Sequence, residues 1–195
     1  MMNLSKNGLE LIKSFEGIRL YAYKCVSSEK YYTIGYGHYG ADVYKGMTIT
    51  KDEAEALLMK DCEKFVNHVN EYQKIYNFNQ NEFDALVSFA YNVGNIRQLT
   101  QKGTRPKNEI PVHMKEYCNA GGVKLNGLVR RRQMEIDLFN KPLPTSNIKL
   151  KDNNTIAIEV IQGKWGNGNA RKVRLTEAGY NYREIQSRVN EMLKV

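Results

Sequence analysis

The sequence predicts an α+β fold with a small sheet and a larger helical part, followed by a separate three-helix bundle. Residues 18–40 are rich in tyrosine and glycine, a composition typical of short strands and tight turns. From Thr50 onwards, apolar residues recur at the spacing of amphipathic helices. Two prolines then interrupt the pattern within residues 141–152, which we interpret as a linker. The predicted domains are therefore residues 1–140 and residues 153–195.

The N-terminal segment predicts the first helix. Apolar residues form one face over residues 5–15, and Ser5 is a suitable N-cap. Gly17 is of the residue type that most often follows a helix end. Glu16 would then lie at the C-terminal end of this helix, facing the segment that follows.

The tyrosine-rich segment is expected to form two or three strands, with a turn at residues 27–30. Two residue pairs, Thr50 with Glu53 and Asn79 with Glu82, match the capping box that starts a helix. Two further helices are expected near residues 109–118 and 125–139. In the tail, helices are expected at about 154–162 and 169–178, and a third after a capping box formed by Asn181 and Glu184.

Composition restricts the classes of function. The net charge of +8 favours anionic partners such as nucleic acid, anionic lipid or a cell wall. No segment approaches the roughly 20 apolar residues of a membrane span, and charged residues interrupt the N-terminal apolar residues. We therefore expect neither stable membrane insertion nor a signal peptide. The three cysteines, Cys25, Cys62 and Cys118, contain no C-x-x-C pair, so we expect reduced thiols, no metal site and no cofactor.

The position of Glu16 suggests acid chemistry. A carboxyl group at a helix C-terminus meets the negative end of the helix dipole, which favours the protonated form. A general acid needs a protonated carboxyl group near neutral pH. The position alone, however, fits an ordinary surface glutamate better.

Four segments carry a more specific signal. They read Phe15-Glu-Gly-Ile-Arg-Leu-Tyr-Ala-Tyr-Lys-Cys25, Thr33-Ile-Gly-Tyr-Gly-His38, Asn81-Glu-Phe-Asp-Ala-Leu-Val-Ser-Phe-Ala-Tyr-Asn-Val-Gly94 and Gly127-Leu-Val-Arg-Arg-Arg-Gln-Met-Glu135. In this order they resemble the phage-type lysozymes, also called endolysins or muramidases. The resemblance covers most of residues 4–140 and implies a lysozyme-like catalytic domain with a sheet lobe and a helical lobe.

The resemblance implies hydrolysis of the β-1,4 bond between N-acetylmuramic acid and N-acetylglucosamine in peptidoglycan. Glu16 would protonate the glycosidic oxygen, Cys25 stands where the family carries Asp or Cys, and Thr33 would help to hold a water molecule. Glu16 and Cys25 keep the family's gap of eight residues. The seven residues between Cys25 and Thr33 are two more than usual, which predicts a longer hairpin.

Cys25 leaves the stereochemical outcome open. A thiol is mostly protonated near neutral pH, so we favour a role in positioning water, with inversion. A nucleophilic Cys25 would instead give retention. Without the motif, a small buried apolar residue would be the better interpretation.

Other residues near the motif have two interpretations each. Tyr36 and Tyr39 could line the cleft, because aromatic faces suit sugar rings, or they could pack in the core; Tyr39 is our candidate for substrate binding. His38 is expected to hold the sheet against the helical part by pairing with an acid. Among the arginines at residues 130–132, at least one is expected near Glu16, and the others are expected to be solvated.

The tail resembles the choline-independent cell-wall-binding repeat of phage endolysins. Its segments Gly163-Lys-Trp-Gly-Asn-Gly168 and Arg174-Leu-Thr-Glu-Ala-Gly-Tyr180 carry the resemblance. Family members bind the muropeptide unit of peptidoglycan, which makes Arg174, Gly179 and Tyr180 candidate contacts. The alternatives are a solvated helix face for Arg174 and the bundle core for Tyr180. We interpret Trp165 as a core residue rather than a ligand contact.

Three hypotheses follow for the whole chain. The first is a lysozyme that is released from the host cytoplasm through a holin and lyses the cell wall from within. The second is an inactive peptidoglycan binder, and Glu16 argues against it. The third is a nucleic-acid binder, but Trp165 in a glycine-rich turn does not fit a recognition helix. A single repeat would bind weakly, so a homo-oligomer would add avidity.

Overall fold

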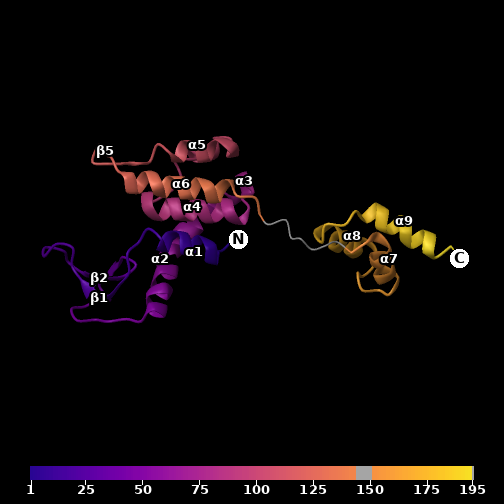
Figure 1. Cartoon of the computed structure of the whole chain (residues 1–195), viewed down its shortest axis with the longest axis horizontal. Helices are drawn as coiled ribbons and strands as arrows, with labels where there is room; N and C mark the ends of the chain where they lie inside the picture. Colours follow the sequence, from indigo (N-terminus) through magenta and orange to yellow (C-terminus); the bar gives the residue numbers. More distant parts are fainter. Residues whose placement is uncertain (144–150, 195) are drawn as a thin grey trace. The chain divides into compact units, whose positions relative to one another are not determined.

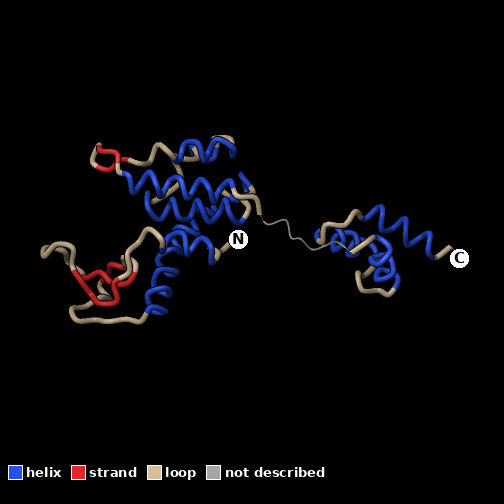
Figure 2. Tube along the Cα trace, viewed as in Figure 1, coloured by secondary structure: helices blue, strands red, loops and turns tan. Residues whose placement is uncertain are grey.

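The structure is a computed structural model that describes residues 1–143 and 151–194. The chain divides into two compact units, Met1–Leu143 and Pro144–Val195, and each is described by itself. Most of the predicted linker, residues 141–152, lies outside the described residues. The α+β prediction is confirmed: helices and small antiparallel sheets make up the first unit, and helices make up the second (Figures 1 and 2).

The first unit contains six α-helices, two short 3-10 helices and five strands among its described residues. In chain order these are α1 (Lys6–Lys13), β1 (Arg19–Tyr23), β2 (Tyr32–Gly35), β3 (His38–Gly40), α2 (Lys51–Glu71), α3 (Gln73–Tyr76), α4 (Gln80–Val93), η1 (Gln101–Gly103), η2 (Lys107–Glu109), α5 (Ile110–Met114), β4 (Asn119–Ala120), β5 (Val123–Lys124) and α6 (Asn126–Asn140).

Helix α1 begins as predicted and ends earlier. The Ser5 hydroxyl accepts a hydrogen bond from the Gly8 amide at 3.3 Å, as an N-cap does. The helix ends at its C-cap Ser14, earlier than the end that Gly17 suggested. Glu16 therefore lies in the turn after the helix, where its amide still donates to the Ile12 carbonyl at 3.2 Å. The last turn of α1 thus still fixes the backbone of Glu16.

The sheet has three antiparallel strands in the order β1-β2-β3. Thr33 of β2 is paired with Tyr23 on one side and with Tyr39 on the other. The connection between β1 and β2 runs over residues 24–31, which is longer than the turn predicted at 27–30. Gly37 has a φ of 95° in the tight turn between β2 and β3, a conformation that favours glycine.

Helix α2 links the sheet to the helical part, and it contacts β2 and β3 as well as α4 (Figure 1). Both predicted capping boxes are present, at the starts of α2 and α4. Helix α4 is buried along most of its length, with Phe83, Leu86 and Phe89 inaccessible to solvent. It packs against α1, α2 and α6, so this helix forms the centre of the core.

The helix predicted at residues 109–118 is shorter than expected. A 3-10 turn precedes α5, and the chain leaves the helix at Lys115 to form the β4–β5 hairpin. Gly121 and Gly122 both have positive φ values and make the turn of that hairpin. Residues 115–118 therefore connect the shorter helix to this hairpin instead of continuing the helix.

The second unit contains three helices: α7 (Asn153–Ile161), α8 (Gly168–Glu177) and α9 (Tyr182–Met192). They enclose a core of their own, formed by Ile156, Ala157, Val160, Leu175, Tyr180, Ile185 and Val189. One detail differs from expectation. Asn181 caps α9, but it is its side-chain amide, not its backbone N–H, that donates to the Glu184 carboxylate, so the reciprocal bond of a capping box is absent from this described cap.

Candidate active site

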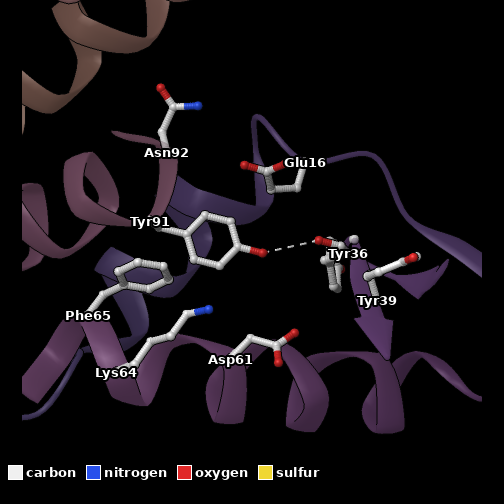
Figure 3. A pocket seen from close by; sticks show the side chains of 9 residues that line it. Glu16, Tyr36, Tyr39, Asp61, Lys64, Phe65, Tyr91 and Asn92 are labelled. Carbon is white, nitrogen blue, oxygen red and sulfur yellow. Dashed lines mark hydrogen bonds between the residues drawn. The ribbon is translucent and has the colours of Figure 1, made fainter. Parts of the chain in front are cut away.

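A cleft of about 490 Å³ lies between the sheet and the helices of the first unit. Its lining consists of Glu16, Tyr36, Gly37, Tyr39, Asp61, Lys64, Phe65, Tyr91 and Asn92. In Figure 3, Asp61 and Lys64 project from α2 on the side opposite to Glu16. The volume is typical of a small-molecule site, for which about 300–1,000 Å³ is usual. The lining is polar and aromatic, as expected for a site that binds sugars.

Glu16 reaches the cleft from the turn after α1 and is bound by an arginine of α6. Its Oε1 lies 2.7 Å from Nη1 of Arg131, and its side chain is 27% exposed. The prediction that one of the three arginines lies beside Glu16 is therefore confirmed. The ion pair with Arg131 therefore holds the Glu16 carboxyl group at the cleft.

Arg131 is itself held by buried groups. Its Nε donates to Oε1 of Glu135 at 3.2 Å, and its Nη2 donates to the Ser88 carbonyl at 3.3 Å. Ser88 also donates to Glu135 through its hydroxyl at 2.8 Å. Burial raises the pKa of Glu135, and the hydrogen bond from Ser88 and the two neighbouring arginines oppose that shift. The guanidinium facing Glu16 is thus fixed by a carboxylate behind it.

The expectation that the other arginines are solvated is wrong for Arg132, which is buried. Its side chain is 1% exposed, and its Nε lies 3.1 Å from Oε2 of Glu135, an ion-pair distance without hydrogen-bond geometry. Its Nη2 donates to Oδ1 of Asn92 at 2.6 Å, and burial lowers the pKa of the arginine. Asn92 lines the cleft. Arg132 therefore connects the buried charges to a residue of the site.

Several cleft residues were not singled out from the sequence. The Tyr91 hydroxyl donates to the Tyr36 carbonyl at 3.3 Å, drawn as a dashed line in Figure 3. Burial raises the pKa of Tyr91, and the carboxylate of Glu16 adds to the effect. Tyr91 and Asn92 stand near the end of the motif helix α4, so this motif contained a signal that could have identified them.

The cleft brings together only some of the predicted site residues. Glu16 and Tyr39 line it, and Tyr39 is 47% exposed. Thr33 is buried in β2 at 7% exposure, and Cys25 is an exposed free thiol beyond the end of β1. Cys25 and Thr33 are not among the residues that line the described cleft.

His38 holds the sheet against α2, as predicted. Its Nδ1 lies 2.9 Å from Asp61 of α2, and its Nε2 lies 3.0 Å from Asp42. Burial alone would lower the pKa of His38, but the hydrogen bonds with Asp61 and Asp42 outweigh it, and the pKa is raised. The protonated histidine therefore stabilises the fold.

This raised pKa predicts a pH-dependent effect of Asp61→Asn. A histidine with a raised folded pKa contributes stability below its unfolded value, about 6.5, and loses that contribution as pH rises through the folded value. We expect Asp61→Asn to lower the free energy of unfolding by about 2 kcal/mol at pH 5.5 and by less at pH 9. Urea denaturation at the two pH values measures this.

Asp42→Asn is the matched control, because Asp42 pairs with the same histidine but is 61% exposed. An exposed pair contributes about 0–1 kcal/mol, so this variant should lose less at pH 5.5. Equal losses for Asp61→Asn at both pH values would contradict the prediction.

In the second unit, the predicted contacts differ in their surroundings. Arg174 is exposed and lies near Gly166. A Cβ added at Gly166 would lie 3.2 Å from Nη1 of Arg174. Gly179 has a φ of 86° and follows the end of α8. Tyr180 is 9% exposed, packs edge-on against Trp165 at 5.7 Å between ring centroids, and accepts a hydrogen bond from the Lys151 amide.

Trp165 itself is partly buried against the core of the bundle, and its indole N–H donates to Glu159 at 3.1 Å. These contacts favour a structural role for Trp165 and Tyr180. Of the three candidates, Arg174 and Gly179 remain at the surface of this unit.

No helix in residues 1–143 or 151–194 has the length and apolar character needed to cross a membrane. No group of three or more histidine, cysteine or acidic side chains in the same ranges could hold a metal ion.

A sheet and a helical part around a cleft, with a glutamate held by an arginine at its edge, define a glycoside hydrolase of the lysozyme class. The chain belongs to the phage lysozyme family, whose model matches residues 13–135. A CW_7 repeat matches residues 154–193. The family predicted from the sequence motifs is therefore confirmed.

Relatives extend over both units. The chain is 43% identical over 190 residues to the endolysin of Lactococcus phage c2, covering 95% of this chain and 81% of that endolysin. It is also 43% identical over 173 residues to the endolysin of Bacillus phage B103, covering 81% of this chain and 64% of the relative. The muramidase domain of SpmX from Asticaccaulis excentricus matches with a TM-score of 0.61 at 33% identity, covering 73% of this chain and 100% of that domain.

Proposed function

We propose that this chain is an endolysin that hydrolyses the β-1,4 bonds between N-acetylmuramic acid and N-acetylglucosamine in peptidoglycan. The observation that carries the proposal is Glu16, which lines the cleft between sheet and helices and is held there by Arg131. Residues 1–140 would form the catalytic domain, residues 141–152 the linker and residues 153–195 the wall-binding repeat. The similarity to two endolysins and a muramidase domain supports this assignment.

In the proposed reaction, the carboxyl group of Glu16 gives its proton to the glycosidic oxygen while the bond from that oxygen to C1 of the muramic acid breaks. A water molecule adds to C1 and loses a proton. Cys25 and Thr33 would position this water, and inversion follows if it attacks directly.

The wall itself would be bound in two places. Tyr39, on the rim of the cleft, would stack against a sugar ring, and Arg174, Gly179 and Tyr180 would contact the muropeptide through the repeat. The exposed positions of Arg174 and Gly179 support these two contacts better than the buried position of Tyr180 supports a third. Self-association would raise the avidity of the single repeat.

The proposed partner is peptidoglycan and not nucleic acid. The enzyme would accumulate in the host cytoplasm and reach the wall after a holin opens the membrane, without inserting into the membrane itself. The positive net charge of +8 suits the anionic bacterial wall.

The identity of the new reducing ends tests the bond assignment. Purified walls are digested, the products are reduced with borohydride, and the amino sugars are separated after acid hydrolysis. We expect reduced N-acetylmuramic acid to appear in step with the loss of turbidity. Reduced N-acetylglucosamine as the main product would contradict the proposal and indicate a glucosaminidase.

A further inference from the structure

The hairpin beyond β1 contains a carboxylate with no assigned role. Glu29 is the only acidic residue between Gly17 and Ala41. In the proposed reaction the attacking water must lose a proton, and a carboxylate is a better acceptor than a thiol that is mostly protonated near neutral pH. Cys25 alone therefore leaves the reaction without an effective base.

The structure places the Glu29 carboxylate directly at Cys25. Oε2 of Glu29 accepts a hydrogen bond from the Cys25 amide at 2.9 Å. The backbone carbonyl of Glu29 accepts another from the Lys24 amine at 2.5 Å. The hairpin thus folds back so that a carboxylate lies beside Cys25, the residue at the position where the family carries Asp or Cys.

The same hairpin is tied to the cleft. The Tyr31 amide donates to the Tyr39 hydroxyl at 3.2 Å, and the two rings pack edge-on at 5.6 Å between centroids. Tyr39 lines the cleft. The turn that carries Glu29 is therefore anchored to a wall of the site.

Glu29 also differs from Glu16 in its charge environment. Within residues 1–143 and 151–194, no lysine, arginine or histidine lies at salt-bridge distance from the Glu29 carboxylate, whereas Glu16 is paired with Arg131. Among the described residues, the Glu29 carboxylate is bonded through Oε2 to the Cys25 amide, which leaves its Oε1 available to accept a hydrogen bond from a water molecule.

We propose that Glu29 is the general base of the reaction. This rests on the proposed muramidase activity. Glu16 protonates the leaving oxygen as the bond to C1 breaks, the oxygen of water bonds to C1, and the Glu29 carboxylate takes the proton that this water releases. The products are a 4-hydroxyl group on N-acetylglucosamine and a reducing N-acetylmuramic acid. Transfer of the proton from Glu29 through solvent back to Glu16 restores the enzyme.

Glu29→Gln separates this role from a role in holding the turn. The Gln side-chain carbonyl can still accept the Cys25 amide, so the turn keeps its bond, but the base is lost. We expect the rate of wall lysis per folded enzyme to fall by about 100-fold, within the range of general base catalysis. The decline in rate at acid pH, which reports protonation of the base, should disappear from the pH profile. Folded enzyme is quantified by thermal unfolding.

The double variant Cys25→Asp with Glu29→Gln is the second measurement. This variant places a carboxylate at position 25 in place of the one lost at position 29. It should lyse walls at least about tenfold faster than Glu29→Gln alone, which is part of the roughly 10²–10⁴-fold that a general base contributes. Glu63→Gln on the exposed face of α2 is the matched control and should lyse walls at the wild-type rate. The proposal requires both the loss of lysis in Glu29→Gln and its partial recovery in the double variant. Any other combination of results overturns it.

A result that rejects Glu29 as the base differs from a result that rejects the muramidase activity. If Glu29 only holds the turn, wild-type enzyme still releases N-acetylmuramic acid ends and Glu29→Gln stays as active as Glu63→Gln. If the proposed activity is wrong, the wild-type enzyme itself does not release those ends.

Discussion

Glu16→Gln should lower the rate of wall lysis by about 1,000-fold, because an amide cannot protonate the leaving oxygen. In free energy this is about 4 kcal/mol of transition-state stabilisation, at about 1.36 kcal/mol for each tenfold change. Gln can still accept the hydrogen bond from Arg131, which lies 2.7 Å from the acid, so the fold should persist. Turbidity loss of purified walls measures the rate, and co-sedimentation measures binding to the same walls.

Wall binding should remain unchanged in this variant, because the repeat in the second unit has a core of its own. Glu63→Gln again serves as the control for loss of one carboxylate elsewhere in the first unit. Wild-type lysis by Glu16→Gln would reject Glu16 as the acid. Loss of both lysis and thermal stability would point instead to a structural role for its pair with Arg131.

Glu135→Gln is expected to cause the largest loss of stability, about 3–5 kcal/mol in the free energy of unfolding. Glu135 is inaccessible to solvent and contacts both Arg131 and Arg132. The substitution keeps the shape but removes the only negative charge in this cluster that is fully buried. The buried Arg132 then loses its carboxylate partner, and Arg131 keeps only the partly exposed Glu16, which together cost far more than a hydrogen bond. Guanidinium chloride denaturation measures the change.

Ser88→Ala is the matched control, because it removes only the hydroxyl group that donates to Glu135 at 2.8 Å. It should cost about 1 kcal/mol, the usual value for one hydrogen bond. A Glu135→Gln loss no larger than this would show that charge compensation is unimportant here.

Much of the fold was predictable because its signals are local. Ser5, Thr50 and Asn79 cap helices through bonds within three residues, so sequence spacing alone identifies them. Where local signals conflict, boundaries were less certain. Gly17 suggested a later end for α1 than Ser14, and residues 115–118 leave the expected helix to form a hairpin.

The candidate site was predictable only in part. The motif identified Glu16, and the presence of an arginine beside it, because both stand at recognisable spacings. It could not show that Arg131 is the one in contact or that Arg132 is buried behind Asn92. Consecutive residues on a helix point about 100° apart, and only the packing of α6 against α4 decides which arginine faces which neighbour.

By itself, the sequence determined the class of fold and the family and supplied the proposed acid, because caps, periodicity and motifs depend on residues close together in the chain. The tertiary structure decided how the charges are paired: Arg131 between Glu16 and Glu135, and His38 between Asp42 and Asp61. The partners in two of these contacts are separated by 115 and 23 positions. Electrostatic interactions depend on distance in space, and only folding sets that distance.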